Sequence, residues 1–103
     1  MELSLYIAAF FAGAFLANAV PHFVHGISGN KFPTPFSKPR GIGLSSAPVN
    51  FIWSLFNLAA GYYLLMAAEI NAQSTCRLIV LFLGVAAIGI MMSFRFQKKH
   101  KEE

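Results

Sequence analysis

The chain contains the stretch LSLYIAAFFAGAFLANAV at residues 3–20, in which no Asp, Glu, Lys or Arg occurs. Two further apolar runs follow at 49–68 and 76–94, and the charged side chain of Arg77 lies only one residue inside the third. A helix needs about 20 apolar residues to cross the hydrocarbon core, and a central charge costs a few kcal/mol. The sequence therefore predicts an all-α integral membrane protein with three transmembrane helices.

The composition leaves no room for a separate soluble domain. The chain has 103 residues, of which 56% are hydrophobic and 12% are charged, and its mean hydropathy is +0.58. We expect a single three-span membrane domain over residues 1–103, with spans at about 3–25, 48–69 and 75–95 and a basic tail at 96–103.

Proline and glycine positions predict the connections. Pro21 can kink a membrane helix without ending it, so we expect a long first helix that is kinked at Pro21 and ends between Gly26 and Gly29. The many Pro and Gly residues between Asn30 and Ala47 predict an irregular loop between helices 1 and 2. The short polar turn at 69–75 predicts that the second and third helices are antiparallel neighbours.

The distribution of basic residues predicts the orientation. Three of the eight Lys and Arg residues lie in the first loop and four follow the third run, which leaves Arg77 on the other side. By the positive-inside rule the N-terminus is outside, and the loop and the C-terminus are cytoplasmic. A cleavable signal peptide ending near Ala17-Asn18-Ala19 is the alternative, but its start would carry Glu2 instead of a positive charge.

The first loop combines basic and aromatic side chains that favour a membrane surface. We expect both the loop and the basic tail to contact anionic lipid headgroups, and we expect no nucleic acid partner. The loop could instead cap the helices, or cover a site as a lid. The residues predicted to contact the membrane surface are Lys31, Phe32, Phe36, Lys38 and Arg40.

Polar side chains recur at helical spacing on the first two spans, and they are the candidate ligand-binding residues. Because the two helices run in opposite directions, Asn50 should lie at the depth of His22, and Ser54 to Asn57 at the depth of Asn18. Such residues either join helices by hydrogen bonds or line a binding site, and the sequence leaves both roles open. The predicted cluster is Asn18, His22, His25, Asn50, Ser54 and Asn57.

The same residues argue against metal, haem and catalytic chemistry. His22 and His25 supply at most two ligands, with no carboxylate or thiolate nearby in the sequence, and a pair at i, i+3 on one helix cannot sandwich a haem. No Asp exists in the chain, and Glu69 lies at the far end of the second span. We therefore expect no metal, no cofactor and no enzymatic activity.

Small residues on two spans favour close helix packing. Ala9, Gly13 and Ala17 form a stripe on the first span, and Gly89 with Ser93 forms another on the third. One three-helix monomer can bury only one such seam well. The second seam predicts a homo-oligomer or a larger membrane partner.

The segments 18–26, 32–36 and 50–53 resemble small multi-pass membrane proteins of bacteria to which no activity is assigned. The resemblance covers about the first two-thirds of the chain, and it implies a location in the bacterial inner membrane.

Two functions fit the residues. The first is an oligomeric or accessory interaction protein, and the alternative is a facilitative transporter, channel or small-ligand-binding protein that uses the His/Asn cluster in the cytoplasmic half of the bilayer.

Overall fold

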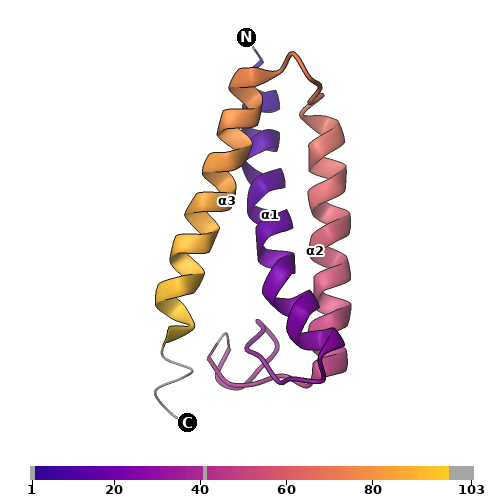
Figure 1. Ribbon diagram of the computed structural model, residues 1–103, viewed down its shortest axis with the longest axis vertical. Helices are drawn as coiled ribbons and strands as arrows, with labels where there is room; N and C mark the ends of the chain where they lie inside the picture. Colours follow the sequence, from indigo (N-terminus) through magenta and orange to yellow (C-terminus); the bar gives the residue numbers. More distant parts are fainter. Residues whose placement is uncertain (1, 41, 98–103) are drawn as a thin grey trace.

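The computed structural model describes residues 2–40 and 42–97, and within them it contains three α-helices and no strand. The helices are α1 (Leu3–Ile27), α2 (Ala47–Ala67) and α3 (Thr75–Arg95), and each is long and apolar enough to cross a membrane. The middle position belongs to α1, which is antiparallel to α2 and parallel to α3 (Figure 1). This confirms the expected all-helical architecture with three helices of membrane-spanning length.

The first helix continues beyond its proline, and a glycine just after its last residue terminates it. Pro21 lies inside α1, and the helix extends to Ile27. Gly29 then adopts a positive φ of 75°, its N–H donates to the Gly26 carbonyl at 3.4 Å, and the Asn30 N–H donates to the His25 carbonyl at 2.9 Å. These two bonds form a Schellman motif, in which glycine tolerates the left-handed backbone. The kink at Pro21 stays a prediction.

Glycines set the contacts of α1 with both neighbours. On the α3 side, Gly13 lies against the backbone of Leu81 and Gly84 lies against the backbone of Phe10. A Cβ at either glycine would collide with the facing carbonyl oxygen, so the two backbones touch directly at this crossing. On the α2 side, Gly26 packs in the same way on the backbone of Phe51.

The second and third helices are not neighbours, and this part of the sequence prediction was wrong. Each of them packs on α1, the Cα atoms of α2 and α3 stay more than 8 Å apart, and α3 diverges from the other helices toward the loop end (Figure 1). A short connection limits only the distance between two helix ends. It does not bring the two helices together along their length.

The irregular loop after α1 folds back beneath the helices. Phe32 and Ser45 exchange backbone hydrogen bonds of 3.2 and 2.9 Å, which draws the two ends of the loop together. The Thr34 and Ser45 hydroxyls meet at 2.5 Å in the same buried region. Ser46 then begins α2 as its N-cap, because its hydroxyl accepts from the Val49 N–H at 3.4 Å.

Candidate functional site

Two hydrogen bonds between side chains join α1 to α2 at the depths that the sequence predicts. The Asn18 Nδ2 group donates to Asn57 Oδ1 at 2.9 Å, and His22 Nδ1 lies 2.8 Å from Asn50 Oδ1. Asn50, Asn57 and His22 are buried, and Asn18 is half-buried. The expected contact between the two polar stripes is therefore confirmed, and it acts directly in helix association.

The Asn50 side chain also binds backbone carbonyl groups of the loop. These hydrogen bonds fix the orientation of its amide and so determine which group it presents to His22. Its Nδ2 group lies 2.9 Å from the Phe32 carbonyl, 3.2 Å from that of Ser45 and 3.0 Å from that of Ser46. Carbonyl oxygens only accept, so the amide nitrogen must face them and Oδ1 must face the imidazole. His22 therefore donates through Nδ1, and in the neutral ring its Nε2 carries the lone pair.

We call the Asn18–Asn57 and His22–Asn50 hydrogen bonds the ladder. The other two members of the predicted cluster, Ser54 and His25, make different contacts. Ser54 is buried, but its hydroxyl donates to the Phe51 carbonyl of its own helix at 2.6 Å. His25 stacks on Phe32, with the ring centroids 4.4 Å apart. Two of the three predicted residues on each helix thus form the contact between helices.

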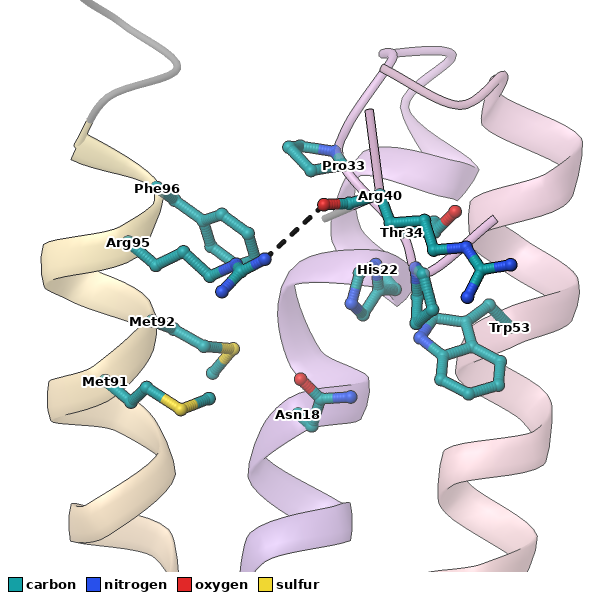
Figure 2. Close-up of a pocket in the computed structure, with 11 residues that line it drawn as sticks. Asn18, His22, Pro33, Thr34, Arg40, Trp53, Met91, Met92, Arg95 and Phe96 are labelled. Atoms are coloured by element: carbon teal, nitrogen blue, oxygen red, sulfur yellow. Dashed lines mark hydrogen bonds between the residues drawn. The ribbon is translucent and has the colours of Figure 1, made fainter. Parts of the chain in front are cut away.

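A cavity of about 260 Å³ opens beside the ladder, at the loop end of the molecule (Figure 2). Residues from α1, α2, α3 and the loop all contribute to its walls. Among the described residues, the lining side chains include no Asp or Glu, and two of them are arginines. Its walls are formed by Asn18, His22, Pro33, Thr34, Pro35, Arg40, Trp53, Met91, Met92, Arg95 and Phe96.

The cavity offers both hydrogen-bond donors and acceptors. Trp53 Nε1 is buried and has no hydrogen-bond partner among the described residues. Figure 2 shows the nitrogen edge of this indole on the side where His22 lies. The guanidinium of Arg40 lies on the Trp53 side, while Arg95 reaches across from α3 and donates to the Arg40 carbonyl at 3.5 Å (Figure 2).

The residues predicted to meet the membrane surface divide into two groups. Lys31, Phe36, Lys38 and Arg40 are exposed, and Phe36 packs edge-on against Trp53 with ring centroids 5.1 Å apart. Phe32 is buried instead, because its ring is enclosed by His25 and Phe96. Its aromatic character serves the packing of the loop against the helix ends.

Several lining residues were not among the predicted site residues. Trp53 is one of them, although it follows Asn50 by three residues and precedes Asn57 by four, which places it near the polar face of α2. The helical spacing could have identified it. Arg95 gives no such signal, because its position depends on the angle at which α3 leaves α1.

Comparisons with protein families, with curated sequences and with solved structures find no match to this chain. The geometry of the residues therefore carries the functional argument.

Proposed function

We propose that this chain is a small interaction protein of the bacterial inner membrane, which assembles with a second copy or with another membrane protein. The N-terminus would face outside, and the basic loop and tail would face the cytoplasm, as the charge distribution favours. The observation that supports the assembly role is the incomplete packing of α3. The backbone of α3 touches that of α1 at Gly84, and α3 diverges from α1 beyond it (Figure 1).

The open face of α3 has the composition of a helix-packing surface. Gly84 is enclosed by the backbone of α1, whereas a Cβ on Gly89 would meet nothing within 4 Å. An apolar groove of about 750 Å³ lies between α1 and the second half of α3, and its walls include Ala17, Gly89 and Ser93. Small residues beside an open groove allow the backbone of another helix to approach closely.

The test of this role uses Gly89→Leu with Ala87→Leu as the matched control. Both changes place a leucine on α3, but Ala87 is exposed and does not line the groove. We expect Gly89→Leu to lower the cross-linked or assembled fraction in mild detergent, and Ala87→Leu to leave it unchanged. Equal assembly of both variants and the wild type would contradict the proposal. Gly13→Leu is unsuitable, because it would disrupt the contact of α1 with α3.

A second candidate function, small-ligand binding, is supported by the loop-end cavity. Asn18 and His22 line it while taking part in the ladder, so the polar cluster can act both as a link between helices and as part of a site. An experimental map of the purified protein would test this role through density for a ligand or lipid beside His22. A dry, tightly packed contact there would contradict it.

A further inference from the structure

The loop-end cavity continues into an apolar groove. A second cavity of about 340 Å³ lies deeper along α1, and it shares Asn18, Trp53 and Met91 with the first. The groove exists because α2 and α3 do not contact each other. Its other lining side chains are apolar except for Asn57, and they include Phe11, Phe15 and Ile88.

The groove covers much of the depth of one leaflet. Phe11 and Asn18 are seven residues apart on α1, which corresponds to about 10 Å along the helix axis. Half of the hydrocarbon core measures about 15 Å. The groove thus follows roughly two-thirds of a leaflet and reaches the level of the Gly13–Gly84 crossing.

The loop-end cavity suits a polar group that is both anionic and hydroxylated. Arg40 and Arg95 place two guanidinium groups at its walls, and Trp53 Nε1 adds a neutral donor. In the neutral imidazole, His22 Nε2 provides an acceptor, since Nδ1 donates to Asn50. An anion accepts hydrogen bonds from guanidinium and indole N–H groups, and a hydroxyl can donate to an imidazole nitrogen.

We propose that the two cavities together bind one anionic phospholipid whose headgroup carries hydroxyl groups, of the phosphoglycerol type. The phosphate lies between the arginines and the indole N–H, a headgroup hydroxyl donates to His22, and one acyl chain follows the apolar groove. The head cavity has room for roughly eight or nine water molecules, which is sufficient for a phosphoglycerol group. This inference deepens the ligand-binding candidate and is independent of the assembly role.

The single tryptophan of the chain provides the assay, because Trp53 lines both cavities. The full chain is placed in vesicles of phosphatidylcholine that contain a fraction of brominated phosphatidylglycerol, and quenching of its fluorescence is measured. The reverse labelling, with brominated phosphatidylcholine, gives the reference. We expect a preference for phosphatidylglycerol on the order of tenfold, because charge-assisted hydrogen bonds form at its phosphate. Equal quenching by the two lipids would overturn the proposal.

Two variants separate the site from general surface attraction. Arg40→Gln should lower the preference about tenfold, because it removes a forked donor. Lys31→Gln removes the same charge from the same loop but lines neither cavity, so its effect should be about fivefold or less. Arg40→Lys keeps the charge without the fork and should fall between the wild type and Arg40→Gln. Equal losses in Arg40→Gln and Lys31→Gln would overturn the proposal.

A soluble competitor distinguishes a lipid from a free phosphate ester. Glycerol 1-phosphate, added at millimolar concentration, should leave the quenching by brominated phosphatidylglycerol unchanged, because it lacks the acyl chain that fills the groove. Relief of quenching by this compound would assign the cavity to a soluble ligand and overturn the lipid. Density beside His22 without any preference for phosphatidylglycerol would likewise overturn this inference while leaving the ligand-binding candidate intact.

Discussion

Replacing Asn50 with alanine would remove the side chain that connects α1, α2 and the loop. Asn50 is completely buried, accepts from His22 and lies within hydrogen-bonding distance of three carbonyl groups. Each of those carbonyls also accepts from a backbone N–H, at Ser45, Phe32 and Asn50 itself, so none is left without a donor. The imidazole N–H of His22 does lose its acceptor in a buried position.

The expected destabilisation follows from these bonds. A buried donor left unsatisfied costs about 1–3 kcal/mol, and a hydrogen bond between membrane helices contributes about 0.6 to 2 kcal/mol. We therefore expect Asn50→Ala to lower the free energy of unfolding by about 2–4 kcal/mol. The loop should loosen as well, because its side-chain link to α2 is lost.

The matched control is Asn57→Ala, which makes the same change two turns along α2. Asn57 also is buried, but it receives only one bond from α1, and the donor, Asn18, is half-buried, whereas His22 is buried. Its expected cost is about 1 kcal/mol. Denaturation in mixed micelles, followed by circular dichroism, compares the two variants. If Asn57→Ala is as destabilising as Asn50→Ala, the central role assigned to Asn50 is incorrect.

The remaining predictions concern packing, orientation and the loop. Gly84→Ala should lower the thermal midpoint by several degrees, because its methyl group would collide with a carbonyl of α1. Gly89→Ala should leave the midpoint unchanged, and equal midpoints of the two variants would contradict the direct backbone contact of α1 with α3 at Gly84. The exposed Cys76 should react with a membrane-impermeant maleimide added outside intact cells, and a Lys38→Cys substitution in a Cys76→Ser background should not; labelling at position 38 would reverse the topology. Thr34→Val should cost about 1 kcal/mol in the same micelle assay, by removing the hydroxyl pair of the loop, and an unchanged stability would show that this pair contributes nothing.

Much of the fold and the ladder between helices follows from the sequence. Long apolar runs predict the three helices because a membrane leaves few alternatives for the backbone. The Asn18–Asn57 and His22–Asn50 pairs follow from helical rise, since antiparallel helices that share a loop have matching depths at equal distances from it. Both predictions use only local geometry and one connection.

The loop-end cavity could not be predicted in this way. Its walls combine four segments, and the approach of Arg95 to Arg40 joins residues 55 positions apart. The inward turn of Phe32 depends on its backbone pairing with Ser45 and on the space left beside His25. A pattern of aromatic and basic residues indicates a membrane surface equally well whether a given ring points outward or inward.

The separation of α2 from α3 was, by contrast, present in the sequence of α1. The contact with α3 is centred on Gly13 and the contact with α2 includes Asn18, and five residues at about 100° each place these positions roughly 140° apart around the helix. Two helices that pack at about 9 Å from a central helix in those directions lie roughly 17 Å from each other, too far for contact. Residues 68–74 can reach this distance, because an extended chain of that length spans about 23 Å. The small stripe and the polar stripe of α1 therefore require a splayed arrangement, and the groove between α2 and α3 is a consequence of that spacing.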